Sequence, residues 1–314
     1  MLGSIVLFFV GLALLYYGAD YLVEGSSRLA LSYGVRRLVV GMTIVSFATS
    51  MPELLVSLLA LIRGSSDIAV GNIVGSNIAN IGLILGASAM VAPLLVPRGL
   101  IKRELPFMIA TTGLLFLFCF DGELGRAESL IFLSLLAGFI FYCIRTARTS
   151  GLDVDSNGDG KGTPSCSRGR DLLFIAGGIV GLGIGAQLMV DSAVLIARSI
   201  GLSELVIGMT IVALGTSLPE LAASMVSASK GEMEISIGNV IGSNIFNILF
   251  VLGFCGLFRP IEVAPSLLRF ELPVVLGFSL ILIPLCRHGY QIDRVKGSLL
   301  LVAYLLFVSV LYLV

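Results

Sequence analysis

Residues 39–86 read VVGMTIVSFATSMPELLVSLLALIRGSSDIAVGNIVGSNIANIGLILG, and residues 206–253 read VIGMTIVALGTSLPELAASMVSASKGEMEISIGNVIGSNIFNILFVLG. The two stretches align without a gap at a constant offset of 167, and 24 of the 48 positions are identical. Polar residues repeat as often as apolar ones, so shared hydrophobicity does not explain the match. At the same offset, GAxxxVE at 18–24 corresponds to GAxxxVD at 185–191. The sequence therefore predicts two copies of one half.

The composition places both copies in a membrane. Apolar residues make up 57% of the 314 and charged residues 13%, with a mean hydropathy of +1.03, whereas soluble domains carry about 25% charged residues. Runs of about 20 apolar residues recur, each long enough to cross about 30 Å of hydrocarbon as a helix. The first run has no small-residue cleavage site, so we interpret it as a retained span. We predict an all-α integral membrane protein with ten transmembrane helices, at roughly 3–24, 37–62, 67–92, 104–120, 127–145, 171–197, 204–229, 234–257, 267–286 and 294–313.

The order of these spans predicts inverted repeats. Five spans separate each element from its copy, and an odd number makes the second copy enter the membrane from the opposite side. We predict two five-helix repeats of inverted topology, 1–146 and 171–314, joined by the polar segment 147–170 as a flexible linker. Within it, Asp153, Asp155, Asn157 and Gly158 match the start of an EF-hand loop, but loop position 12 is Pro164 instead of Glu. A solvated linker is therefore favoured over a calcium loop.

Basic residues indicate the orientation. With the N-terminus outside, the inner loops hold fifteen of the 20 basic residues, and the outer loops hold only Arg63, Arg126, Arg198, Arg259 and Arg269. By the positive-inside rule, both termini are expected outside the cell membrane and the linker in the cytoplasm.

Each copy places the same polar residues inside the membrane. Thr49 and Glu53 lie four residues apart on one helix face, with Ser50 beside them. Ser76 and Asn80 have the same spacing in the following span. The second copy repeats the set at the offset of 167 as Thr216, Ser217, Glu220, Ser243 and Asn247.

Proline and glycine accompany this set. Pro52 and Pro219 lack a backbone N–H, so the carbonyls of Ala48 and Gly215 are expected to lose their helical partners and become available to cations. Glycines around the set would allow close helix packing, at positions 41, 71, 75, 208, 238 and 242.

The chemistry of the set favours hard cations. A charged Glu at bilayer depth costs about 2.5 kcal/mol or more, and no Lys, Arg or His lies in the apolar segments around Glu53 and Glu220. Bound cations or protons remain as compensation. Carboxylate, amide, hydroxyl and carbonyl oxygens suit Ca²⁺ or Na⁺ and disfavour soft metals. Two carboxylates neutralise one Ca²⁺ or two Na⁺, so exchange against a third Na⁺ would move charge.

These residues resemble the sodium/calcium exchangers of the cation/calcium exchanger superfamily. ATSMPE at 48–53, GSNIAN at 75–80, GTSLPE at 215–220 and GSNIFN at 242–247 resemble the ion-binding motifs of the two alpha-repeats in that family. The resemblance implies Na⁺/Ca²⁺ antiport by alternating access, with ions near the membrane midplane. It implies a calcium site formed by Glu53, Glu220 and the backbone oxygens of Thr49 and Thr216. It implies sodium ligands at Ser50, Ser76, Ser217 and Ser243 and at the backbone carbonyls of Ser46 and Ala213, with Asn80 and Asn247 at the centre.

Two positions depart from the family pattern. Ala48 stands where the family usually has Gly, and Asn247 stands where potassium-dependent members have Asp. The second departure argues against potassium cotransport.

Other functions fit less well. A Ca²⁺/H⁺ antiporter of the same superfamily is the nearest alternative, although the Ser and Thr beside each Glu favour sodium. A passive cation channel is disfavoured by inverted halves with interrupted helices. An enzyme is not expected, because His288 is the one histidine and no HExxH or GxSxG motif is present. The net charge of zero gives no reason to expect nucleic acid, and neither a cofactor nor an obligate protein partner is expected besides the two ions and the lipid bilayer.

Overall fold

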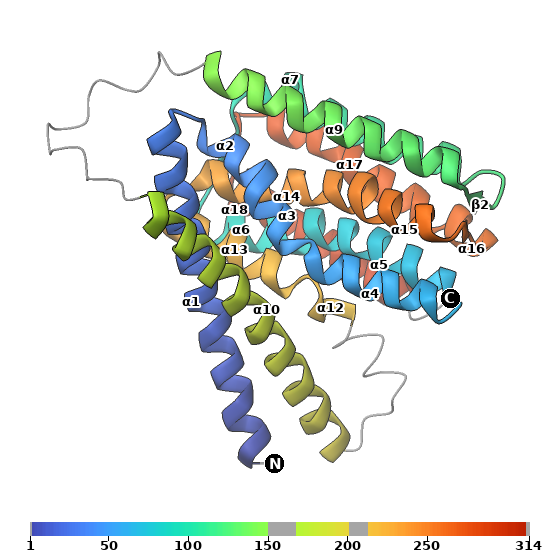
Figure 1. The fold of residues 1–314 in the computed structure, drawn as a ribbon, viewed down its shortest axis with the longest axis horizontal. Coiled ribbons are helices and arrows are strands. Elements are labelled where there is room, and N and C mark those ends of the chain that lie inside the picture. Colours follow the sequence, from blue (N-terminus) through green and yellow to red (C-terminus); the bar gives the residue numbers. More distant parts are fainter. Residues whose placement is uncertain (1, 150–167, 201–212, 312–314) are drawn as a thin grey trace, which may run out of the picture.

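The computed structural model describes residues 2–149, 168–200 and 213–311, and nearly all of them are helical (Figure 1). The first half contains α-helices and two short π-helical turns, η1 and η2. In chain order they are α1 (Leu2–Tyr33), α2 (Arg37–Val40), η1 (Gly41–Val45), α3 (Ser46–Thr49), α4 (Met51–Ile62), α5 (Ser66–Ala79), η2 (Asn80–Ile84), α6 (Leu85–Val91), α7 (Arg98–Lys102), α8 (Glu104–Phe118) and α9 (Arg126–Thr149).

The second half repeats this order. Its elements are α10 (Arg168–Ser199), α12 (Ala213–Gly215), α13 (Leu218–Ser229), α14 (Met233–Phe246), the π-helical η4 (Asn247–Leu252), α15 (Gly253–Phe258), α16 (Pro265–Arg269), α17 (Glu271–Arg287) and α18 (Arg294–Leu311). Several elements begin at the offset of 167 from their counterparts, including η4 relative to η2 and α16 relative to α7.

Several of these helices are long and apolar enough to span a membrane. Seven helices in the described ranges have at least 18 residues and are apolar enough to cross a bilayer, and Arg37–Thr49 with Met51–Ile62, bent by 40°, makes an eighth if the pair is one span. The predicted spans at 104–120 and 204–229 fall outside this set. The first corresponds to α8 with 15 residues, and part of the second lies in 201–212, outside the described residues.

Helices extend past two of the predicted boundaries. The first span is predicted at 3–24, and α1 continues to Tyr33, with Arg28 paired to Glu24 one turn earlier at the polar end of the helix. Helices also extend into both ends of the predicted linker 147–170, since α9 ends at Thr149 and α10 begins at Arg168. The EF-hand-like residues 153–158 lie outside the described residues.

Two of the spans form the centre of the bundle. In the span Ser66–Val91, 72% of the apolar window is buried, and in Met233–Phe258 the figure is 83%, against 22–28% in the other five. These two spans carry the GSN motifs. Their polar groups are thereby kept from lipid, where each unsatisfied group would cost several kcal/mol, while the outer helices present apolar faces to the bilayer.

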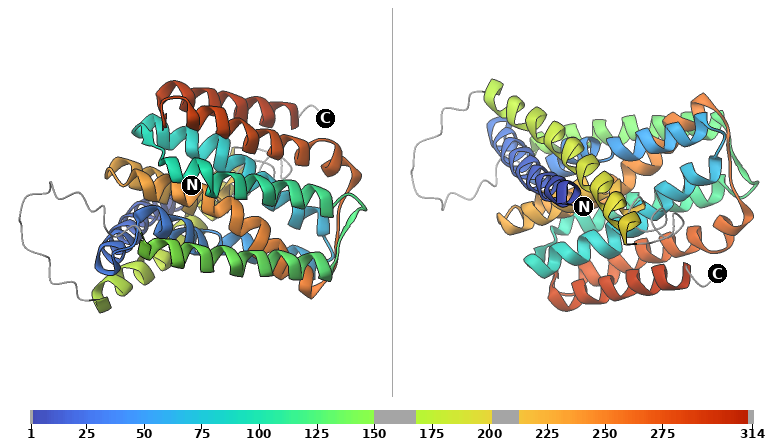
Figure 2. Two further views of the ribbon diagram at one scale, coloured as in Figure 1. Left: turned by 90° about the horizontal axis from the view of Figure 1, so that it is seen from above. Right: turned by 90° about the horizontal axis from the view of Figure 1, so that it is seen from below.

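Helices α1 and α10 lie side by side and lean away from the other helices at one end (Figures 1 and 2). Their contact depends on glycine. A Cβ on Gly18 would lie 2.6 Å from the Leu182 nitrogen, and one on Gly178 would lie 2.7 Å from the Gly18 oxygen. The two backbones therefore touch directly, as in small-residue helix pairs of membranes.

Two short strand pairs join the halves of this nearly all-helical structure. Strand β1 (Leu94–Leu95) pairs with β4 (Gln291–Ile292), and β2 (Glu123–Leu124) pairs with β3 (Ile261–Glu262), both antiparallel. The registers are Leu94 with Ile292 and Leu124 with Ile261. Each half thus contributes one strand to each pair.

Candidate functional site

Two interrupted helices carry the acidic residues. Helix α3 ends at Thr49, Ser50 has φ −81° and ψ 3°, and α4 begins again with Pro52 as its second residue. In the second half Ser217 has φ −88° and ψ 4° before α13. Proline at the start of a helix is favoured because its missing N–H would have no partner there. Glu53 and Glu220 therefore lie in the first turns of α4 and α13, where helix dipoles favour negative charge.

Glu53 is fully buried among hydroxyl groups from both halves. Its Oε1 accepts hydrogen bonds from the Ser76 hydroxyl at 3.5 Å and from the Ser217 hydroxyl at 3.4 Å. The two hydroxyls lie 3.3 Å apart. The second oxygen, Oε2, has no hydrogen-bond partner among the described residues. The first carboxylate thus faces a helix break of the other half.

Glu220 has the reciprocal arrangement. It is also buried, and its Oε1 accepts a hydrogen bond from the Ser50 hydroxyl at 3.5 Å. Its Oε2 likewise has no partner within the ranges that the structure describes. Ser50 and Ser217 occupy corresponding positions in the two copies, so each helix break supplies a hydroxyl to the carboxylate of the opposite half.

Two asparagines hold these breaks together, and the sequence analysis did not predict them. The Asn72 amide donates to the Glu53 carbonyl at 3.4 Å and the Ser57 hydroxyl at 3.1 Å, while its oxygen accepts from the Thr216 hydroxyl at 3.4 Å. Each asparagine therefore ties the carboxylate helix of its own half to a threonine of the other.

Asn239 repeats the pattern with Glu220, Ser224 and Thr49, at 3.4, 3.0 and 3.3 Å. The signal was available in the sequence, because both asparagines lie in the duplicated GNIVGSN and GNVIGSN segments.

Thr49, Ser46 and Ser243 meet where α14 crosses η1 and α3. The Thr49 hydroxyl lies 3.5 Å from the Ser243 hydroxyl, and the Ser46 hydroxyl donates to the Asn239 carbonyl at 3.0 Å. The Ser46 carbonyl accepts from the Thr49 hydroxyl at 3.4 Å. Ala213, the predicted counterpart of Ser46, is the first residue of α12.

Asn80 and Asn247 begin the π-helical turns η2 and η4. Such turns occur often at functional sites. Neither amide atom of Asn80 has a partner among the described residues, and the Asn247 amide donates to the Asn77 oxygen at 3.0 Å while its own oxygen is unpaired there. Asn77, a further residue not predicted, also donates to the Asn244 carbonyl at 3.2 Å.

Within the described residues, the predicted glycine packing is seen at Gly41, Gly238 and Gly242. A Cβ on Gly41, Gly238 or Gly242 would lie 2.2–2.7 Å from atoms of the facing helix, whereas Gly71 and Gly75 have no described neighbour within 4 Å. Gly208 lies outside the described residues.

The departure at Ala48 is accommodated. Its side chain is buried in a cluster with residues of α1, whereas a Cβ on its counterpart Gly215 would lie 2.5 Å from a methyl of Val190. The site therefore accommodates alanine in the first half, whereas an alanine at 215 would require the Val190 side chain to shift.

The structure thus brings Glu53 together with Ser76 and Ser217, Glu220 with Ser50, and Thr49 with Ser46 and Ser243. Thr216 is connected to the Glu53 side of the site by its hydrogen bond to Asn72, and Asn247 is hydrogen-bonded to Asn77. Among the described residues, no group of three or more His, Cys, Asp and Glu could hold a metal ion, so any ion here would be held by two carboxylates with hydroxyl, amide and carbonyl oxygens. His288, by contrast, is exposed at the end of α17.

Apolar outer helices around a buried polar centre define a multi-pass integral membrane protein. Comparison with known families gives a match to the sodium/calcium exchanger protein model over residues 3–145 and 171–313. The chain belongs to the sodium/calcium exchanger family.

Relatives and solved structures agree with this assignment. The sodium/calcium exchanger MaX1 of Methanosarcina acetivorans is 35% identical, and the alignment covers 98% of each chain. The inner membrane protein YrbG of Escherichia coli is 37% identical over 99% of this chain and 98% of its own. Solved structures of the sodium-calcium exchanger NCX_Mj superimpose with a TM-score of 0.84 at 34% identity, covering 98% of both chains. The prediction of a prokaryotic-type sodium/calcium exchanger is confirmed, and this family is one of transporters.

Proposed function

We propose that the protein exchanges Na⁺ for Ca²⁺ across the cell membrane by alternating access, with the ions as its substrates. The ions bind between the two halves at Glu53, Glu220 and their surrounding oxygens. The single observation that carries the proposal is the reciprocal arrangement of these groups, in which each buried carboxylate faces a hydroxyl from the helix break of the opposite half.

Oxygen spacing supports a cation in this centre. The hydroxyl contacts at the two carboxylates span 3.3–3.5 Å, longer than the usual O–H···O distance of about 2.7–2.8 Å. Neighbouring ligands at right angles around Ca²⁺, each about 2.4 Å from the ion, lie about 3.4 Å apart. The oxygens thus have the spacing of a coordination shell.

Unpaired acceptors support the same assignment. Glu53, Glu220, Asn80, Asn244 and Asn247 each present a buried oxygen without a partner among the described residues. Such oxygens are costly in an apolar interior unless a donor or a cation compensates them. A hard cation compensates several at once.

The number of carboxylates predicts charge movement. Two acids balance one Ca²⁺ or two Na⁺, and Asn247 adds an amide in place of a third acid. Exchange of three Na⁺ for one Ca²⁺ would therefore transfer one net charge and make transport electrogenic. The same count gives no carboxylate for a potassium ion.

Two inverted five-helix repeats, 1–146 and 171–314, form the proposed scaffold of ten transmembrane helices. The corresponding hydrogen bonds of Asn72 and Asn239, together with the reciprocal strand pairs, support a two-fold relation between the halves. The linker 147–170 lies in the cytoplasm and both termini lie outside, as the basic residues favour. Ala213 supplies a backbone oxygen to a sodium site, as Ser46 does in the first half.

Ca²⁺/H⁺ exchange is the competing function. A proton on Oε2 of either glutamate would also neutralise buried charge, and this oxygen is unpaired in both. The hydroxyls of Ser50, Ser76 and Ser217 around the carboxylates favour sodium, because a proton needs no such shell of oxygens.

Proteoliposomes distinguish the two. Purified protein is reconstituted, and calcium uptake is measured under an outward sodium gradient or under an outward proton gradient at equal sodium on both sides. We expect uptake with the sodium gradient. Because three Na⁺ leaving for one Ca²⁺ entering removes positive charge from the vesicle, uptake should be faster when the vesicle interior is held at a positive potential. Uptake with the proton gradient alone refutes sodium coupling.

Glu53→Gln and Glu220→Gln should each abolish uptake, because one of the two balancing charges is lost. Glu123→Gln, at an exposed residue of β2, is the matched control and should retain wild-type uptake. Transport at the wild-type rate by either buried variant removes that residue from the site.

A further inference from the structure

We propose that the groove between α8 and α9 binds an anionic phospholipid, with an acyl chain along the groove and the phosphate at Arg103. The groove has a volume of about 510 Å³ and includes Arg103, Glu104, Phe107, Leu135, Gly138 and Tyr142 in its lining. This inference goes beyond ion exchange, and its test measures lipid binding alone.

The shape of the groove suits an alkyl chain. Gly138 has no side chain, and an added Cβ there would meet no described atom within 4 Å. Phe107 and Phe139 stack with ring centroids 5.0 Å apart and form one wall. An apolar channel that opens toward the membrane is therefore available beside the outer face of α9.

The charge at one end of the groove suits a phosphate. Arg103 is exposed between α7 and α8, and its guanidinium forms no ion pair or hydrogen bond with the described residues. Glu104 does not neutralise it, because that carboxylate is buried, 3.7 Å from the Arg36 guanidinium and 3.5 Å from the Tyr142 hydroxyl. Arg103 thus keeps its five donors for an anion, and guanidinium matches phosphate geometry.

The corresponding positions in the second half carry different residues. Arg103 corresponds to Phe270 at the offset of 167, and Gly138 corresponds to Leu306 at the offset of 168 that relates β4 to β2. Phe270 stacks against Phe307 at 6.1 Å. Where the second half packs its own aromatic ring, the first half has an arginine beside a glycine.

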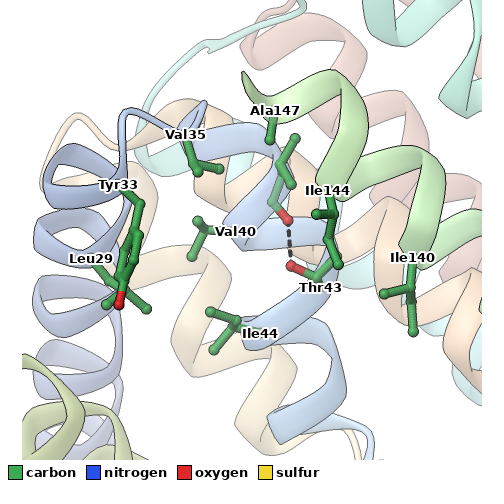
Figure 3. Close-up of a pocket in the computed structure, with 10 residues that line it drawn as sticks. Leu29, Tyr33, Val35, Val40, Thr43, Ile44, Ile140, Ile144 and Ala147 are labelled. Carbon is green, nitrogen blue, oxygen red and sulfur yellow. Dashed lines mark hydrogen bonds between the residues drawn. The ribbon is translucent and has the colours of Figure 1, made fainter. Parts of the chain in front are cut away.

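A neighbouring groove lacks this charge (Figure 3). It has a volume of about 390 Å³ between α1, η1 and α9, and its ten lining residues include no charged side chain. Its Thr43 hydroxyl already donates to the Val39 carbonyl at 2.7 Å. Of these two grooves, only the one at Arg103 therefore combines an apolar channel with a cationic end.

The inner leaflet is the expected source of the lipid. In the proposed orientation Arg103 lies at the cytoplasmic surface, where anionic lipids are attracted to basic residues with about 1 kcal/mol per residue. That free energy corresponds to a preference of about fivefold for an anionic over a zwitterionic lipid.

Fluorescence quenching tests the site directly, because the chain contains no tryptophan. Phe107→Trp places a single fluorophore in the groove, and Leu299→Trp places one on an exposed lipid-facing position of α18. Each protein is reconstituted in phosphatidylcholine with increasing brominated phosphatidylglycerol, and separately with brominated phosphatidylcholine. We expect Phe107→Trp to prefer the brominated phosphatidylglycerol about fivefold and Leu299→Trp to show no preference.

A second substitution in the Phe107→Trp protein identifies which residues of the groove bind the lipid. Arg103→Gln should remove the preference, and Gly138→Leu should reduce quenching by both lipids, because it places a side chain in the open space beside Gly138. Arg287→Gln, an exposed basic residue outside the groove, should leave both unchanged. The proposal is overturned if Arg103→Gln retains the preference, if both tryptophans report the same preference, or if inorganic phosphate alone competes with the brominated lipid.

Discussion

Gly242 offers the sharpest test of how packing sets the ion site. A Cβ at this position would lie 2.2 Å from the Ser46 hydroxyl oxygen and 2.6 Å from both the Cα and the carbonyl oxygen of Met42. The hydroxyl could rotate away, but the Met42 backbone belongs to η1 and cannot. Gly242→Ala must therefore move α14 away from η1 by about 1 Å to restore an ordinary van der Waals contact.

The free energy of this change has two opposing parts. Overpacking of this kind costs about 1–3 kcal/mol, and replacing a helical glycine by alanine returns up to about 1 kcal/mol. We expect net destabilisation of about 1–2 kcal/mol. The matched control is Gly183→Ala, because Gly183 is exposed within α10 and has no described neighbour within 4 Å. The control should be neutral or slightly stabilised.

The functional effect should exceed the loss of stability. Thr49 lies in α3, which follows directly on η1, and its hydroxyl is 3.3 Å from the Asn239 oxygen and 3.5 Å from the Ser243 hydroxyl of α14, so a shift of about 1 Å opens these contacts beside the ion site. Misplacement of about 1 Å can cost up to about 100-fold in an organised site, and we expect calcium affinity to fall at least tenfold.

Thermal unfolding in detergent and the calcium dependence of uptake measure the two effects. Equal behaviour of Gly242→Ala and Gly183→Ala in both assays would refute the packing argument. A loss of stability with unchanged calcium affinity would show that the crossing of α14 and η1 does not position the site.

Three further predictions concern polar contacts. Asn239→Leu should lower stability by about 1–3 kcal/mol in thermal unfolding, because the buried Glu220 carbonyl loses its donor; an unchanged midpoint would contradict this. The Asp20–Lys230 pair at 2.5 Å is partly exposed, so a double-mutant cycle with Asp20→Asn and Lys230→Gln should give a coupling of at most about 1 kcal/mol that decreases in high salt. Asn247→Asp adds a third acid to the centre, so the site with three Na⁺ becomes neutral and the site with one Ca²⁺ carries one negative charge; the voltage dependence should therefore move from the sodium-carrying to the calcium-carrying step, and unchanged voltage dependence of calcium uptake would remove this residue from the ion path.

Much of the fold follows from the chain's periodic features. The apolar runs predicted every described span to within several residues at most ends, because hydropathy reports where a helix lies in hydrocarbon. It does not report where the helix itself stops. Helix α1 therefore continues to Tyr33 past the predicted end at 24, stabilised by polar contacts of Arg28 with Glu24 and of Ser27 with Glu232.

The candidate site was predicted less completely. Glu53 and Glu220 stand out in the sequence because a membrane-buried carboxylate needs compensation. Asn72 and Asn239 do not stand out in the sequence, because an asparagine in a span is ordinarily a helix-packing residue. The role of each depends on hydrogen-bond partners 15 to 190 positions away in the chain.

The sequence by itself determined that the protein resides in a membrane, that it consists of two copies, and that each copy buries one glutamate beside hydroxyl and amide groups. These properties follow from composition, repetition and the cost of charge in hydrocarbon. Only the tertiary structure decided that Ser217 reaches Glu53 while Ser50 reaches Glu220. Contacts between residues so far apart in the chain depend on how the helices cross, and the crossing is set by which glycines let backbones meet.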